Sequence, residues 1–174
     1  CDDGSKNWRV TSVYPAGYPK NASGCPTPRS GSANDASGLL LKIKVPTNAN
    51  SFSYDFDFYS SEYPEWVCSL YNDSFVALLS STHPVNVGNA GAPWYKNISF
   101  DAKGSPININ TDYFTVTDQA SLAGSGFDGT NCWNEIQDRR VQCGAATGWL
   151  RSTAPVKPGE VLTMQFAIWD TGDH

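Results

Sequence analysis

The sequence predicts an all-β protein, specifically a jelly-roll-like antiparallel β-sandwich with long loops and little helix. Three observations favour this class. Aromatic residues make up 13% of the chain, charged residues only 17%, and methionine occurs once, which leaves few good helix formers. The 15 glycines and 11 prolines provide for many turns. Several short segments alternate apolar and polar residues, which is the period of a half-buried strand.

The chain length indicates one domain. A chain of 174 residues can bury one hydrophobic core, but it is short for two. We therefore expect a single β-sandwich domain over residues 1–174. Residues 1–37 are polar and contain several X-Pro pairs, which disfavour helix, so we expect an irregular lead-in there.

Two strands are expected after this lead-in. Residues 38–45 place four apolar side chains on one face with lysines opposite, and Pro46 ends the run. Residues 52–58 alternate Phe or Tyr with polar residues. Only residues 47–51 separate the two segments, a length typical of an antiparallel connection, so we expect the strands to lie side by side.

The remaining elements follow from shorter patterns. An apolar strand is expected at residues 73–79, and a longer one with a clear core face at 161–169. Residues 107–110 and 113–116 predict two short strands. Residues 81–104 and 118–131 are rich in Gly, Ser, Asn or Asp and predict loops.

Acidic residues gather in two places that the strands could bring together. One place is the loop at residues 60–73, and the other directly follows the strand at 161–169. Carboxylate and amide oxygens are the ligands that calcium prefers, although turn formation alone also explains such residues. We predict one Ca²⁺ site formed by Glu62, Asp73, Asp170 and Asp173, completed by Asn72 or loop carbonyls.

Five cysteines suggest disulfides. Cys132 and Cys143 bracket a polar loop and predict one bridge. Cys25 and Cys68 could join the lead-in to the acidic loop. Cys1 would then be left over, and its role as a free thiol, a disulfide partner or a lipid attachment site stays open.

Other features limit location and partners. Disulfides and the sequons at Asn21, Asn72 and Asn97 favour an extracytoplasmic protein, although sequons also arise by chance. The formal net charge of -5 does not favour nucleic-acid binding. No apolar run approaches the ~20 residues of a transmembrane segment.

Two blocks of the sequence resemble a known family. They contain residues 56–67 (FDFYSSEYPEWV), 72–75 (NDSF), 147–150 (TGWL) and 166–173 (FAIWDTGD). These motifs are similar to those of the bacterial choice-of-anchor L domain. The resemblance implies a secreted or surface-displayed β domain, often joined to varied anchors, with no established enzymatic activity.

The sequence departs from the family pattern twice. The family usually carries two acids before the tyrosine, whereas this chain has Ser61 and Glu62. The family also continues past the terminal acids into a last apolar strand. We therefore expect a final strand to be missing after residue 174, supplied either by the chain's own continuation or by a neighbouring subunit.

The function expected from these observations is that of a calcium-binding protein of the bacterial cell surface, acting in adhesion or as a subunit of a surface assembly or filament. The alternative is a lectin-like module that stacks sugars on Trp66, Trp94, Tyr95 or Trp133. A glycoside hydrolase fits less well, because Glu62 and Glu65 stand three apart across a Tyr-Pro turn and need not face one another. We expect no enzymatic activity.

Overall fold

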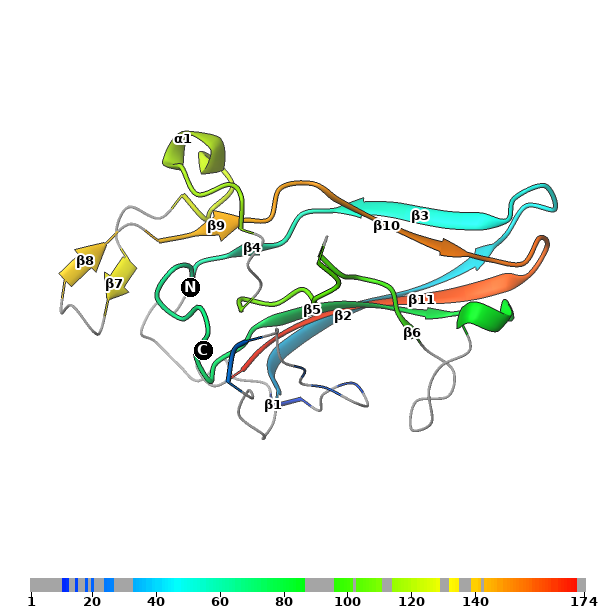
Figure 1. Ribbon diagram of the computed structural model, residues 1–174, viewed down its shortest axis with the longest axis horizontal. Coiled ribbons are helices and arrows are strands. Elements are labelled where there is room, and N and C mark those ends of the chain that lie inside the picture. Colours follow the sequence, from blue (N-terminus) through cyan, green and yellow to red (C-terminus); the bar gives the residue numbers. More distant parts are fainter. Residues whose placement is uncertain are drawn as a thin grey trace.

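The strands form two facing layers, with short elements at one end (Figure 1). This computed structural model confirms the predicted all-β, antiparallel class. It describes residues 11–12, 15, 18, 20, 24–26, 33–86, 96–101, 103–110, 114–128, 132–134, 139–141 and 143–171, without the side chains of 11–12, 132–134 and 139–141.

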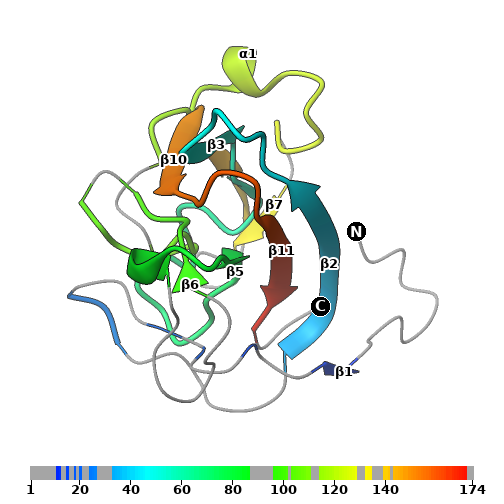
Figure 2. The same cartoon turned by 90° about the vertical axis from the view of Figure 1, so that its right-hand side faces the viewer.

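The larger layer is a five-stranded antiparallel sheet in the order β1-β2-β11-β5-β6. Its centre is β11, which pairs with β2 on one side and β5 on the other. Figure 2 shows this sheet nearly end-on, with β2 curving along its border. The strands are β1 (Thr11–Ser12), β2 (Ala33–Lys44), β5 (Ser74–Ser80), β6 (Lys96–Asn97) and β11 (Val161–Asp170).

The second layer consists of β3 (Ser51–Phe56) paired with β10 (Leu150–Pro155). Two small two-stranded sheets and two short helical elements complete the described structure. They are β4 (Tyr59–Ser60) with β9 (Ala145–Ala146), β7 (Cys132–Asn134) with β8 (Arg139–Val141), the 3₁₀ helix η1 (Pro84–Asn86) and α1 (Gln119–Leu122).

Two expectations about β2 are wrong. The strand begins at Ala33 rather than at residue 38, because Ala33 and Asn34 pair with β1 and Asn34 also pairs with the end of β11. The neighbour of β2 is β11, not β3, so residues 47–50 carry the chain from one layer to the other. The aromatic face of β3 explains this arrangement, since it must cover the sheet rather than extend it.

Aromatic side chains of β3 pack on the inner face of the larger sheet. The ring of Tyr54 meets that of Phe166 edge-on at 5.1 Å, and the ring of Phe56 lies 5.2 Å from that of Phe75. Deeper in the interface, β11 buries Leu162 and Met164 completely. The alternation read from the sequence therefore identifies the inward face of β3, and that of β11 as far as Phe166. It is wrong at the end of β11, where Ile168 is exposed and Trp169, on the opposite face, is buried in a separate cluster with Ala33 and Val76.

The short strands predicted at 107–110 and 113–116 are absent from the described part of the chain, which omits residues 111–113. Ile107 and Ile109 are fully buried, but the segment makes only an isolated bridge through Asn108 to Ser74. The chain turns there because the Asn108 side chain accepts a hydrogen bond from the Asn110 N–H. Among the described residues, no helix has the length and hydrophobicity needed to cross a membrane.

Candidate metal centre

The pairing of β5 with β11 brings two of the predicted acids together. Ser74 lies opposite Trp169 at the end of the antiparallel ladder. Asp73 directly precedes Ser74 and Asp170 directly follows Trp169, so the register sets these two acids across from one another. The Asp73 Oδ1 also accepts a hydrogen bond from the Thr171 N–H at 3.1 Å.

Glu62 reaches the same place from the loop after β4. The Glu62 N–H donates to Ser60 Oγ at 3.1 Å, and the Glu62 carbonyl accepts from the Trp66 N–H at 3.0 Å. The carbonyl of the next residue, Tyr63, accepts from the Gly144 N–H at 3.0 Å. These bonds turn the chain sharply after β4 and tie the turn to the segment before β9.

The far end of this loop is fixed by a disulfide. Cys25 and Cys68 are bonded, with their Cα atoms 4.8 Å apart, so this pair joins the lead-in to the acidic loop. The Cys68 N–H also donates to Asn110 Oδ1 at 2.7 Å. The acidic loop is therefore held at both ends before it enters β5.

Together, the two loops create a three-carboxylate cluster made of Glu62, Asp73 and Asp170. One carboxylate oxygen from each residue lies within 4.8 Å of the others. Glu62 is buried, while the two aspartates are half-buried. Three like charges at this spacing repel one another and are poorly solvated, so the cluster favours a cation.

The other two predicted ligands have different outcomes. Asn72 is fully buried, and its Nδ2 donates to the Lys20 carbonyl at 3.2 Å. Its Oδ1 accepts no hydrogen bond from the described residues. The Thr171 Oγ1, beside Asp170, is likewise buried without a hydrogen-bond partner there. Asp173 lies outside the described residues.

Among the predicted aromatic platforms, one side chain, that of Trp66, belongs to the described residues. Trp66 is half-buried and packs edge-on against Tyr71, with ring centroids 5.2 Å apart. Trp94, Tyr95 and the side chain of Trp133 lie outside the described residues. Trp149 was not among the predicted sugar-stacking residues, but it lies directly before β10 and is 78% exposed. Its position directly after Gly148 was the signal that the sequence offered, because glycine favours a turn and a residue beside a turn is often exposed.

The remaining cysteines and sequons add two observations. Cys143 is disulfide-bonded, but the side chain of Cys132 lies outside the described residues, so their pairing stays a prediction.

Two of the three sequon asparagines have buried side chains that donate hydrogen bonds. The Asn97 Nδ2 donates to the Ser99 carbonyl at 3.1 Å, and the Asn72 Nδ2 donates to the Lys20 carbonyl. Neither amide is placed to carry a glycan in this fold; Asn21 is outside the described residues.

Comparison with known proteins agrees with the resemblance seen in the sequence. Residues 27–174 match the family described as the choice-of-anchor L domain. Separate comparisons with curated proteins and with solved structures each found no match. The Cys25–Cys68 disulfide fits an extracellular protein. Because the match covers most of the chain, the protein belongs to the choice-of-anchor L family, which indicates a cell-surface or secreted bacterial domain.

Proposed function

We propose that this domain binds one calcium ion through the three-carboxylate cluster and acts at the bacterial surface in adhesion or as a subunit of a surface assembly. The observation that carries the proposal is the convergence of Glu62, Asp73 and Asp170 within 4.8 Å. Hard oxygen donors without histidine or cysteine suit calcium better than a transition metal.

The residues around the three-carboxylate cluster support the assignment to calcium, which needs many oxygen ligands. Calcium takes about six to eight oxygens, so three carboxylates and their neighbours must supply several more. Buried acceptors without partners among the described residues occur next to the cluster in sequence, at Asn72 and Thr171. Loop carbonyls and water can complete the shell.

The ion would serve the fold rather than a reaction. Its ligands come from the loop after β4, the start of β5 and the end of β11, so binding would connect an otherwise irregular loop to the central strands. Such a connection stabilises a domain that must keep its shape outside the cell. It favours a structural or adhesive role over catalysis.

The test is calorimetric titration of chelator-treated protein with calcium. We expect one site per chain, lost in Asp73→Asn and in Glu62→Gln. Glu65→Gln provides a matched control, since this acid lies in the same loop but outside the three-carboxylate cluster. Absence of heat in the native chain, with no change in melting temperature on adding calcium, would refute the metal site.

A lectin-like role is the second candidate, favoured by Trp149. This residue is 78% exposed, whereas the large apolar and aromatic side chains of the second layer are half-buried. An exposed indole can stack on the apolar face of a sugar. Glycan-array binding that disappears in Trp149→Ala and survives in Trp66→Ala would favour this role; absence of any glycan binding would eliminate it.

A further inference from the structure

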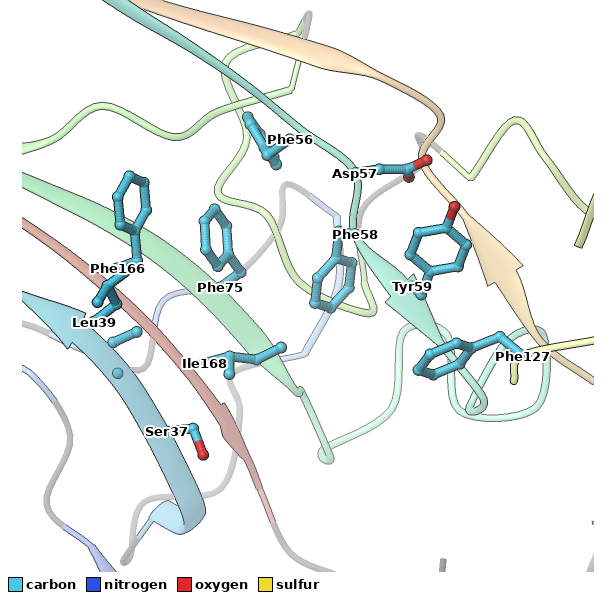
Figure 3. A pocket seen from close by; sticks show the side chains of 12 residues that line it. Ser37, Leu39, Phe56, Asp57, Phe58, Tyr59, Phe75, Phe127, Phe166 and Ile168 are labelled. Carbon is cyan, nitrogen blue, oxygen red and sulfur yellow. The ribbon is translucent and has the colours of Figure 1, made fainter. Parts of the chain in front are cut away.

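An open apolar groove runs between the two layers near the crossing from β3 to β4. It has a volume of about 480 Å³. Figure 3 shows aromatic rings from the β3–β4 segment facing side chains of the larger sheet across this space. Leu39, Phe75, Phe166 and Ile168 line the sheet side, and Phe56 and Phe58 line the opposite side.

The groove exists because the second layer is narrower than the first. The β3–β10 pair covers β11, β5 and Ile43 near the end of β2, but it does not extend over Leu39 and Leu41 of β2. As a result, Leu39 is 54% exposed and Leu41 is 36% exposed although both lie on the inner face. Ile168, beside them on β11, is 42% exposed.

The strand β3 reaches the groove at Phe56, and its outer edge is open among the described residues. Ser51–Phe56 pairs with β10 on one side, and among the described residues no strand pairs with its other side. Backbone N–H and C=O groups of alternate residues therefore point out from this edge. One additional strand at this position would pair with β3 and cover the exposed side chains of β2 at the same time.

Among the described residues that line the groove, one is charged. Asp57 lies where β3 passes into β4, and its negative charge raises the pKa of the neighbouring Tyr59 phenol. A basic side chain would be attracted to this end of the groove. The two ends of the groove are thus chemically different, which would orient a bound segment.

We propose that the groove accepts an extended segment of another protein, with apolar side chains at alternate positions and a basic residue near Asp57. A second copy of this chain is a poorer occupant, because a chain with a formal net charge of -5 does not complement the negative charge of Asp57. The biological role of this binding rests on the proposed function of the domain in surface assembly. Binding of the segment in the groove itself requires no metal.

The experiment measures fluorescence anisotropy of a labelled nine-residue peptide that alternates valine and threonine and ends in lysine. It is titrated with the full chain, once with calcium and once with chelator. A second peptide carries N-methyl groups on alternate residues, which block strand pairing but keep the side chains. Leu39→Glu is compared with Leu40→Glu, since these neighbours are 54% and 57% exposed on opposite faces of β2.

We expect saturable binding that N-methylation abolishes and Leu39→Glu weakens about tenfold or more, whereas Leu40→Glu changes it by less than about twofold. Asp57→Asn should weaken the lysine peptide but not one ending in threonine. Equal binding of the N-methylated peptide, or equal effects of the two leucine variants, would overturn the proposal. So would a concentration-dependent dimer that Leu39→Glu dissociates, because the occupant would then be a second copy.

The titrations with calcium and with chelator, together with the calorimetric test, distinguish the groove proposal from the metal-site proposal. Peptide binding without calcium binding would support the groove and refute the metal site. Calcium binding without peptide binding would do the reverse.

Discussion

Glu160 Oε1 accepts a hydrogen bond from Ser81 Oγ at 2.6 Å, which joins the turn before β11 to the end of β5. The same carboxylate accepts bonds from the Lys157 N–H at 2.7 Å and from both the N–H and the hydroxyl of Thr82. Burial raises the pKa of Glu160, but these donors outweigh it and lower the pKa from 4.5 to about 2. Ionised Glu160 therefore stabilises the fold.

This arrangement predicts a loss of stability in acid. The folded pKa lies below the unfolded one, so the contribution is complete above about pH 5 and is lost as the pH falls through 4.5 towards 2. Solvent screening at this half-exposed site limits it to about 1 kcal/mol. Urea unfolding at pH 7 and pH 3 should show a smaller pH difference in Glu160→Gln. Ser81→Ala, which removes one of the donors to Glu160, should reduce this pH difference by a smaller amount. If the pH difference in both variants equals that of the native chain, the predicted role of Glu160 is wrong.

The three-carboxylate cluster predicts opposite effects of one substitution in two buffers. Without calcium, Asp73→Asn should stabilise the protein by about 0.5–1 kcal/mol, because it removes like-charge repulsion and an amide oxygen can still accept the Thr171 N–H. With calcium, the native chain should gain melting temperature and the variant should not. Thermal unfolding in chelator and in millimolar calcium measures both. A variant that loses stability in chelator would show that repulsion is not the dominant effect.

The Cys25–Cys68 disulfide is expected to support both the fold and the calcium site. The two cysteines are 43 residues apart, and a bridge of this span contributes about 4 kcal/mol in the chain-entropy model. Replacing both with serine should lower the free energy of unfolding by a similar amount and weaken calcium binding. Chemical denaturation and calorimetry test the two effects. Stability equal to that of the native chain would mean that the bridge does not constrain the unfolded state.

Gly144 is expected to tolerate no side chain. Its φ is +95°, and a Cβ there would lie 1.9 Å from the Phe127 carbonyl oxygen. Gly144→Ala should therefore destabilise the fold by more than about 2 kcal/mol through strain and displacement of backbone. Gly104→Ala is the matched control, since φ is +82° but the space around its Cβ is open. If both variants lose the same free energy of unfolding, the backbone conformation alone, and not the contact with Phe127, causes the loss.

A further mapping experiment addresses the bridge at Cys143. We expect peptide mapping without reduction to recover Cys132 linked to Cys143. The backbone fits this, because Cys132 pairs with Val141 in the β7–β8 ladder, two residues before Cys143. A link from Cys143 to Cys1 instead would correct the prediction.

Local patterns in the sequence predicted the core faces well, and the pairing of strands poorly. Alternation indicates which side chains of β3 and of β11 up to Phe166 face inward, because the two-residue period is a property of the strand itself. At the end of β11 the burial reverses, since Ile168 is exposed and Trp169 is buried. Pairing depends on distant segments, so β2 was assigned the wrong neighbour. β10 was missed because its buried face carries small or polar residues such as Ser152 and Ala154.

The acidic site was partly predictable for a similar reason. Asp73 and Asp170 flank the ends of two apolar strands, and such ends meet when the strands pair. Glu62 was included because of its motif, while its position depends on bonds to Ser60 and Gly144 that no local pattern reveals. The apolar groove could not be predicted at all, since the exposure of Leu39 results from the width of the opposite layer.

The register that joins Ser74 to Trp169 also limits how this domain can change in evolution. Side chains alternate along a strand, so deleting one residue within β5 or β11 would turn Asp73 or Asp170 to the opposite face of the sheet. Two residues would have to be lost or gained together to keep the acids facing one another. We expect the lengths of these two strands to be inherited as a pair, while the loop carrying Glu62 can vary wherever its anchoring bonds are kept.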